Sequence, residues 1–204
     1  MICIVDYGAG NLASVKNILK KVGAEDVVIS NQKEEILKAD KIILPGVGKF
    51  DFGMQRLIDS GLIEALERRV MVDKVPFLGI CLGAQLVTNG SEEGKLPGLG
   101  WVDGKTVSFK NRIPSELKIP HMGWNTVSIS NKNTLLDNSE SDGRFYFVHS
   151  YFLQMEDPKC VWLTASYGIE FCAAYHSKNI YACQFHPEKS HKFGMKLMEK
   201  FTAL

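Results

Sequence analysis

Residues 75–85 read Val75-Pro76-Phe77-Leu78-Gly79-Ile80-Cys81-Leu82-Gly83-Ala84-Gln85. The apolar run predicts a buried strand that stops at Gly79 to Ile80, and the residues from Gly83 to Asn89 predict a helix. Cys81 would then lie on a sharp strand-to-helix turn, and small residues two positions on either side of it leave room for the close chain approach that such a turn requires. The unpaired N–H groups of a helix start favour a thiolate over a thiol, so Cys81 is a candidate nucleophile.

A lone cysteine in an apolar strand is also a common core residue. We expect this simpler role for the other four cysteines, which are Cys3, Cys160, Cys172 and Cys183. The turn alone does not decide between the two roles of Cys81.

The first half of the chain alternates predicted strands with predicted helices. Strands are expected at residues 2–5, 27–30, 41–44 and 75–80, and helices at residues 12–22, 34–39 and 53–70. This alternation predicts an α/β fold with a doubly wound, mostly parallel sheet flanked by helices. Ligand sites in such sheets lie at the carboxyl ends of the strands, where Asp6, residues 45–48 and Cys81 fall.

Beyond Trp101 the sequence is rich in strand-forming residues. Strands are expected at 106–109, 125–129, 145–152, 162–167, 171–175 and 180–185, with a hairpin turn at 177–179 and a covering helix at 190–204. This predicts an antiparallel, strand-rich C-terminal half. We find no linker or internal repeat, so residues 1–204 are predicted to form a single domain.

Composition excludes several classes of protein. The chain has 204 residues, 45% of them hydrophobic, and a formal net charge of +1, with no basic stripe of the kind that binds nucleic acid. Five cysteines without a CxxC pair predict neither a disulfide framework nor a metal site, and no cofactor is expected. The N-terminus enters a strand directly and no apolar run is long enough to span a membrane, so we expect a cytoplasmic protein.

The first loop, Gly8-Ala9-Gly10-Asn11-Leu12-Ala13, follows a predicted strand and matches the pattern G-x-G-x-x-A. A dinucleotide site would need an acidic residue about 20 positions later, where the sequence has Ser30 and Asn31. The glycines are therefore interpreted as turn residues. A non-catalytic nucleotide-binding or regulatory α/β domain stays open as an alternative of another class.

A cysteine nucleophile needs a base, and the base needs a group that orients it. The segment Gln184-Phe185-His186-Pro187-Glu188 supplies both, because residues two apart in extended chain point the same way. The His186 imidazole could take the Cys81 proton with one nitrogen and hold the Glu188 carboxylate with the other. In isolation, each of these residues would be an ordinary surface side chain.

Acyl chemistry also requires donors for a developing oxyanion. The Leu82 N–H at the predicted helix start is one candidate. The glycine-rich segment Pro45-Gly46-Val47-Gly48, at the end of a neighbouring strand, could present another through the Val47 and Gly48 peptides. An ordinary strand-end turn explains the same residues equally well.

These motifs occur together in one order along nearly the whole chain, which resembles the class I (triad) glutamine amidotransferases, and among them the glutaminase subunits of imidazole glycerol phosphate synthase. The segments that carry the resemblance are Asp6-Tyr7-Gly8-Ala9-Gly10-Asn11, Leu44-Pro45-Gly46-Val47-Gly48, Gly79-Ile80-Cys81-Leu82-Gly83, Pro120-His121-Met122-Gly123-Trp124-Asn125, Val148-His149-Ser150-Tyr151 and Phe185-His186-Pro187-Glu188-Lys189-Ser190.

The resemblance implies that Cys81 attacks the side-chain amide of glutamine, with His186 and Glu188 completing a triad. A glutamyl thioester and ammonia form, and water then releases glutamate. By the same match, the residues expected to line the glutamine pocket are Gly46, Gln85, Glu93, His149, Ser150 and Tyr151. Glu93 is expected to hold the substrate α-amino group.

The resemblance also implies a partner, a (β/α)8 cyclase barrel of the HisF type that forms a heterodimer and uses the ammonia to make imidazole glycerol phosphate for histidine synthesis. Asn11, Trp124 and Lys189 match positions at the subunit interface. The Val47 peptide is expected to adopt its active oxyanion form only with the loaded partner.

Two departures from the family pattern leave the destination of the ammonia open. Ala84 stands where methionine is common, and residues 191–195 read His-Lys-Phe-Gly-Met. Both resemble a paralogous group that supplies ammonia to a sugar amidotransferase in surface polysaccharide synthesis. A Cys-His-Glu hydrolase of peptides or small acyl compounds, active without a partner, is a further alternative.

Overall fold

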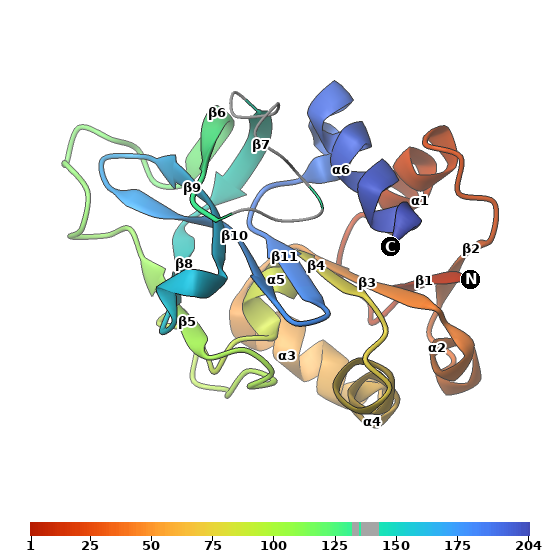
Figure 1. Ribbon diagram of the computed structural model, residues 1–204. Coiled ribbons are helices and arrows are strands. Elements are labelled where there is room, and N and C mark those ends of the chain that lie inside the picture. Colours follow the sequence, from red (N-terminus) through yellow and green to blue (C-terminus); the bar gives the residue numbers. More distant parts are fainter. Residues whose placement is uncertain (132–134, 136–142) are drawn as a thin grey trace.

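The computed structural model describes residues 1–131, 135 and 143–204 of the chain (Figure 1). Eleven strands form a sheet with the order β2-β1-β3-β4-β11-β10-β9-β6-β7, and β5 and β8 pair with each other beside this path. The strands are β1 (Ile2–Val5), β2 (Val27–Ser30), β3 (Lys41–Gly46), β4 (Phe77–Cys81), β5 (Gly104–Ser108), β6 (His121–Ile129), β7 (Arg144–His149), β8 (Tyr151–Met155), β9 (Val161–Ser166), β10 (Glu170–Ser177) and β11 (Ile180–Cys183). The helical segments are α1 (Leu12–Lys21), α2 (Lys33–Lys38), α3 (Phe50–Asp59), α4 (Ile63–Glu67), η1 (Arg68–Val72), α5 (Leu82–Leu86), η3 (Pro158–Cys160), η4 (Pro187–Lys189) and α6 (His191–Ala203).

The predicted α/β class is confirmed. Strands β2, β1, β3, β4 and β11 pair in parallel, and the remaining pairs, all among β5 to β11, are antiparallel, so the sheet as a whole is mixed. Within the C-terminal half, the strands pair with one another in antiparallel fashion, as expected. The last parallel strand, β11, comes from the C-terminal half and lies beside β4, which brings residues 180–183 next to the turn at Cys81.

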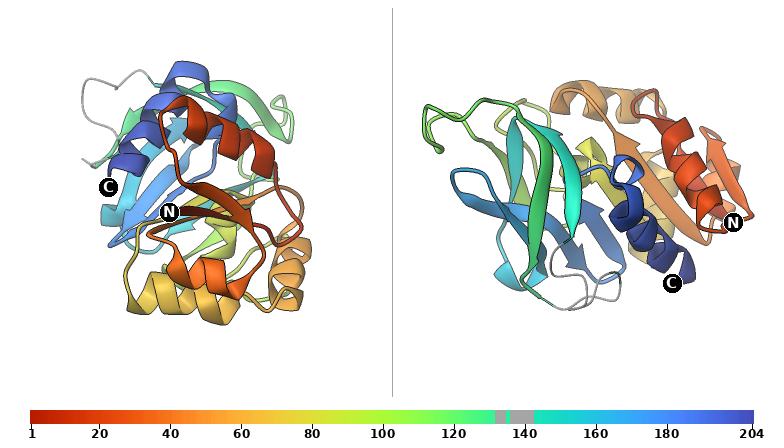
Figure 2. Two further views of the ribbon diagram at one scale, coloured as in Figure 1. Left: turned by 90° about the vertical axis from the view of Figure 1, so that its right-hand side faces the viewer. Right: turned by 90° about the horizontal axis from the view of Figure 1, so that it is seen from above.

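Helices cover both faces of the parallel part of the sheet. Helices α1 and α6 lie together on one face and α2, α3 and α4 on the other (Figures 1 and 2). Side chains of β1 alternate between the two cores: Ile2 and Ile4 pack with α1 and α6, whereas Cys3 and Val5 pack with α2, α3 and α4. This alternation is the period of a strand that is buried on both faces.

The turn after β4 is very tight. Cys81 has φ 54° and ψ −110°, outside the common regions for a residue with a side chain. A Cβ at Gly79 would lie 2.9 Å from the Gly83 carbonyl oxygen, and one at Gly83 would overlap the Leu44 carbonyl oxygen of β3. Both glycines are therefore required by close backbone approach.

Several predicted boundaries are wrong, each for a local reason. The strand expected at 145–152 is broken at Ser150, because β7 pairs with β6 whereas β8 pairs with β5 and β10. The helix expected at 53–70 starts at Phe50 and is divided at Gly61, which has φ 66°. The helix after Cys81 ends at Leu86, because the backbone of Asn89 already bonds to Gly104 at the start of β5.

Two further expectations need correction. Strand β11 ends at Cys183 and does not continue to residue 185, although the Gln184 N–H still donates to the Ala173 carbonyl of β10 at 2.8 Å. Cys160, at the end of η3, is only half-buried, whereas Cys3, Cys172 and Cys183 are core residues as expected.

Candidate active site

A pocket of about 300 Å³ opens at the carboxyl ends of the central strands, beside the turn at Cys81. Its lining residues are Val47, Gly48, Cys81, Leu82, Gln85, Glu93, Pro120, Val148, His149, Ser150, Tyr151 and His186. The structure thus brings ten of the predicted site residues together from five separate parts of the chain. Glu188 lies behind His186, and Gly46 is buried beneath the pocket loop and does not line the pocket.

The His186 and Glu188 side chains form a buried pair. His186 Nδ1 lies 2.8 Å from Glu188 Oε1, and the two side chains are 2% and 3% exposed. Because a carboxylate only accepts, the proton of this contact sits on Nδ1, so that in the neutral imidazole Nε2 is left to accept a proton. Nε2 is buried and has no hydrogen-bond partner among the described residues, and His186 lines the same pocket as Cys81.

The electrostatic surroundings favour the charged form of this imidazole. Burial by itself lowers the pKa of His186, but the neighbouring Cys81 and Glu188 side chains outweigh it and raise the pKa above its usual value. A histidine in this setting can take a proton from a thiol and keep it next to a thiolate.

The local path of this segment differs from the expected extended chain. His186 has an extended backbone, and Pro187 starts the short 3-10 segment η4. This turn brings the Glu188 carboxylate back to the His186 imidazole. The buried Ser190 hydroxyl donates to the His186 carbonyl at 2.6 Å and accepts from the Tyr146 N–H at 3.0 Å. Ser190 thus anchors the turn to β7, a role that the sequence pattern did not indicate.

The glycine-rich loop after β3 forms one edge of the pocket. Val47 is 43% exposed, and Gly48 has φ 112°, which favours glycine. Below the loop, Gly46 pairs with Cys81 across the sheet, and a Cβ at Gly46 would overlap the Tyr7 hydroxyl. The loop is therefore fixed at its base and open at its tip.

Glu93 connects this loop to the opposite edge of the pocket. Its Oε2 accepts from the Phe50 N–H at 2.9 Å, two residues beyond Gly48. In the opposite direction, the Asp51 carboxylate accepts from the backbone N–H groups of Lys95, at 2.9 Å, and Leu96. Two carboxylates thus join the segments 50–51 and 93–96 reciprocally.

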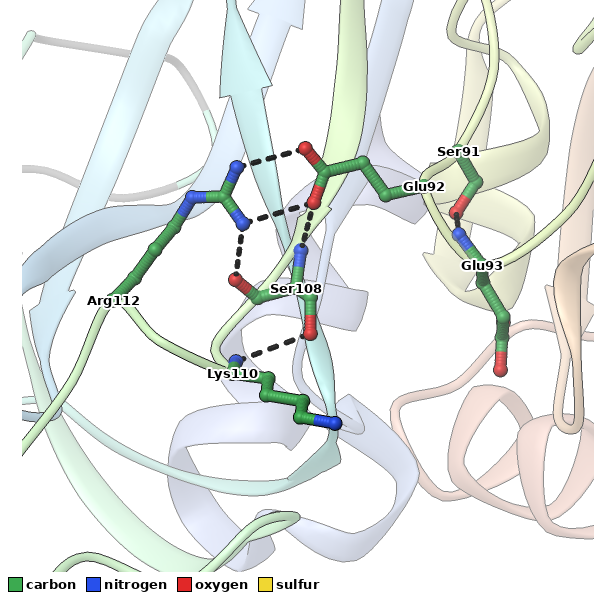
Figure 3. A network of polar contacts seen from close by, with 6 residues as sticks. All are labelled: Ser91, Glu92, Glu93, Ser108, Lys110 and Arg112. Carbon is green, nitrogen blue, oxygen red and sulfur yellow. Dashed lines mark hydrogen bonds and ion pairs between the residues drawn. The ribbon is translucent and has the colours of Figure 1, made fainter. Parts of the chain in front are cut away.

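The neighbouring Glu92 points the opposite way and fixes the segment to β5 (Figure 3). Its two carboxylate oxygens accept from the Arg112 guanidinium at 2.8 and 2.9 Å, and Oε2 also accepts from the Ser108 N–H at 2.8 Å. The Ser108 backbone and the Arg112 guanidinium hold the pKa of Glu92 below its usual value. Arg112 therefore helps to position Glu93 from outside the pocket.

Two further histidines are buried near the pocket in neutral form. His149 Nδ1 donates to the Tyr151 carbonyl at 2.8 Å, so its Nε2 accepts from His121 Nδ1 at 2.9 Å. His121 Nε2 in turn accepts from the Asn125 side chain at 3.2 Å. Burial lowers the pKa of His121 to about 4 and that of His149 to about 3. His121 and Asn125 thus support His149 from β6, a role that the sequence pattern did not indicate.

The predicted interface residues Asn11, Trp124 and Lys189 are exposed, and the last two lie near each other. Trp124 is 41% exposed and stacks on His191 with ring centroids 5.2 Å apart. The Tyr146 ring lies between Trp124, at 6.2 Å, and the Lys189 ammonium, at 5.7 Å. Asn11 caps α1, which packs against η4 and α6. The sequence analysis missed Tyr146.

The described residues contain neither a metal-binding cluster nor a membrane-spanning helix. Within residues 1–131, 135 and 143–204, there is no group of three or more His, Cys, Asp or Glu that could hold a metal ion. No helix in the described part of the chain is long and apolar enough to cross a membrane.

Comparison with known proteins gives matches over the whole chain. The family model "Glutamine amidotransferase class-I" matches residues 3–203. The chain is 56% identical over 201 residues to the imidazole glycerol phosphate synthase subunit HisH 2 of Methanococcus maripaludis, with 98% of each chain covered. It is 49% identical over 204 residues to HisH 2 of Pseudomonas aeruginosa, with 100% of each chain covered.

A second subunit of the same archaeon is less similar. The chain is 45% identical over 209 residues to HisH 1 of Methanococcus maripaludis, with 100% of each chain covered. Among solved structures, PurLQS from Thermotoga maritima has a TM-score of 0.71 at 18% identity, with 99% of this chain and 97% of that chain covered. At this identity, the structural match supports the fold only.

The neutral state of His149 predicts a pH dependence of stability. Its folded pKa is depressed, so the unfolded chain takes up a proton first as the pH falls below about 6.5, and stability that is present above this pH is lost. We expect wild type to lose about 1.4 kcal/mol more between pH 7.5 and 5.5 than His149→Gln, since one proton is involved. Urea unfolding at both pH values measures this difference, and equal losses in the two proteins would contradict it.

Proposed function

The chain belongs to the class-I glutamine amidotransferase family, and we propose that it is the glutaminase subunit of an imidazole glycerol phosphate synthase. Residues 1–204 would act as one glutaminase domain, with Cys81, His186 and Glu188 as the catalytic triad. The observation that carries the proposal is the buried His186–Glu188 pair, whose free Nε2 lies on the pocket of Cys81.

In the proposed reaction, the Cys81 sulfur attacks the side-chain carbonyl carbon of glutamine while His186 Nε2 takes the thiol proton. The oxyanion that forms would accept from the Leu82 N–H and from the loop of Val47 and Gly48. Collapse of this intermediate breaks the C–N bond, and His186 returns the proton to the leaving ammonia. Water, deprotonated by His186, then hydrolyses the glutamyl thioester and frees glutamate and the thiol.

The rest of the pocket fits the ends of a glutamine molecule. Oε2 of Glu93 is occupied by the Phe50 N–H, which leaves Oε1 to hold the substrate α-amino group. On the opposite wall, the chain changes from β7 to β8 at Ser150, and His149, Ser150 and Tyr151 all line the pocket there. These residues and Gln85 would orient the substrate.

The surface around the pocket supports a protein partner. Four apolar side chains are exposed in this region. Val47 lines the pocket, Ile119 precedes β6, and Met122 and Trp124 lie on β6. Such a group of exposed apolar side chains is typical of an interaction site. We propose that a HisF-type (β/α)8 cyclase barrel covers this surface, contacts Asn11, Trp124 and Lys189, receives the ammonia and sets the Val47 peptide.

One observation favours a second destination for the ammonia. The chain is 56% identical to HisH 2 but 45% identical to HisH 1 of the same archaeon, so it is closer to the second of two copies there. A second copy is free to serve another synthase. The second candidate is therefore a paralogous glutaminase that feeds a sugar amidotransferase in surface polysaccharide synthesis.

The proposed chemistry also suits one compartment. Cys81 has to remain a free thiol, and the five cysteines are free in the structure. A reducing cytoplasm preserves such thiols, so we place the enzyme there.

The test is glutamate release by the chain alone and with a histidine-pathway barrel subunit plus its nucleotide substrate. We expect strong stimulation in the complex and its complete loss in Cys81→Ser, because serine is a far weaker nucleophile beside the same base. Ammonia-dependent synthesis by the barrel should survive in that variant and serves as the control. No stimulation, with glutaminase activity appearing instead beside a polysaccharide-pathway barrel, would favour the second candidate.

The Arg112–Glu92 contact predicts a change in substrate affinity. Arg112→Gln should raise the KM for glutamine about threefold to tenfold with little change in kcat, because Glu93 loses its outer support. Lys110→Gln is the matched control, since only the Lys110 backbone contacts Ser108. Equal KM values for the two variants would show that Glu93 is positioned without Arg112.

A further inference from the structure

Gln184 lies at the back of the pocket, between β11 and His186, and its side chain is completely buried. Its Nε2 lies 3.7 Å from Cys81 Sγ, and its Oε1 lies 3.0 Å from Gln85 Nε2. The side chain thus bridges the candidate nucleophile and a lining residue one helical turn beyond it. None of the roles assigned above uses this residue.

In the structure the NH2 end of the Gln184 amide faces the sulfur. The Gln184 oxygen accepts from Gln85 Nε2, and the Gln184 NH2 group is left to donate to Cys81 Sγ. The Gln184 backbone is held as well, because its N–H donates to the Ala173 carbonyl at 2.8 Å. The Gln184 NH2 group is therefore held in position to donate to the Cys81 sulfur.

We infer that Gln184 is a further catalytic residue of the proposed glutaminase, whose side-chain amide donates a hydrogen bond to the Cys81 sulfur and stabilises the thiolate. The inference rests on the proposed function for its catalytic meaning only. The contact itself stands on the geometry.

The chemistry of the step explains why such a donor is useful. When the Cys81 proton moves to His186 Nε2, negative charge appears on a sulfur that is only 7% exposed as a residue and has little access to water. A buried N–H aimed at this atom offsets part of the lost hydration. Because the amide is neutral and does not titrate, it neither competes for the proton nor repels the imidazolium.

A purely structural Gln184 would give a different result in one measurement. If the side chain only filled space, a methionine of similar length would leave the protonation of Cys81 unchanged. If it stabilises the thiolate, loss of the N–H must raise the pH at which the thiolate forms. The titration of Cys81 therefore separates the two roles.

The experiment is the rate of iodoacetamide alkylation at Cys81 between pH 5 and 10, followed by site-resolved peptide mass spectrometry. Wild type is compared with Gln184→Met, which lacks the N–H donor. It is also compared with Gln184→Glu, which replaces the amide by a negatively charged carboxylate of the same shape. Cys183→Ala is the control, since it alters the adjacent buried residue, whose Sγ bonds instead to the Phe185 carbonyl. Circular dichroism and thermal melting check that each variant folds.

We expect alkylation of Gln184→Met to be about tenfold slower near pH 7, with recovery at alkaline pH, because one hydrogen bond to a thiolate is worth about one pH unit. Gln184→Glu should shift the profile further in the same direction, and Cys183→Ala should follow wild type. Profiles of folded Gln184→Met and Gln184→Glu that match wild type would overturn the inference. Failure of both variants to fold would also overturn it, since Gln184 would then be a core residue.

The same proteins separate this inference from the proposed function. Wild type that releases no glutamate with either barrel partner, together with shifted alkylation profiles in the variants, would refute the glutaminase and keep the contact. Glutamate release by wild type with unchanged profiles would refute the role of Gln184 alone.

Discussion

The close approach of the backbone at the turn after β4 determines the site. Gly83 packs directly on the Leu44 carbonyl of β3, and Cys81 takes up a positive φ as a consequence. Because β11 is the parallel neighbour of β4, with Cys183 opposite Ile80, the chain that leaves β11 passes beside the sulfur. The sheet order therefore brings both His186 and the Gln184 amide to the region of Cys81.

Environment gives the buried histidines of this region different protonation states. The Cys81 and Glu188 side chains raise the pKa of His186, whereas burial lowers the pKa of His149, whose hydrogen-bond partners carry no negative charge. Both line one pocket, yet only His186 is suited to hold a proton taken from the thiol near neutral pH. The neutral His121 and His149 side chains instead support the pocket wall at the change from β7 to β8. These two histidines thus have a structural role, and His186 has the proposed chemical role.

The sequence was sufficient for the features that depend on local pattern. The strand-to-helix turn and the spacing of His186 and Glu188 are short-range signals, and the alternation of strands and helices is visible directly. The contact of Gln184 with Cys81 joins residues 103 positions apart, and that of Glu93 with Phe50 spans 43 positions, so they depend on sheet order and loop packing. The break at Ser150 also escaped prediction, because the aromatic run on both sides favours strand equally.

The most direct test of the account is to treat the chain, alone and with the partner barrel, with the glutamine-like electrophile diazo-oxo-norleucine and to locate the label by peptide mass spectrometry. The account predicts a single adduct on Cys81 that excess glutamine prevents and that is absent from His186→Ala, because only an activated thiolate in a glutamine pocket reacts in this way. An unlabelled Cys81 under every condition, or a label that glutamine does not prevent, would contradict it.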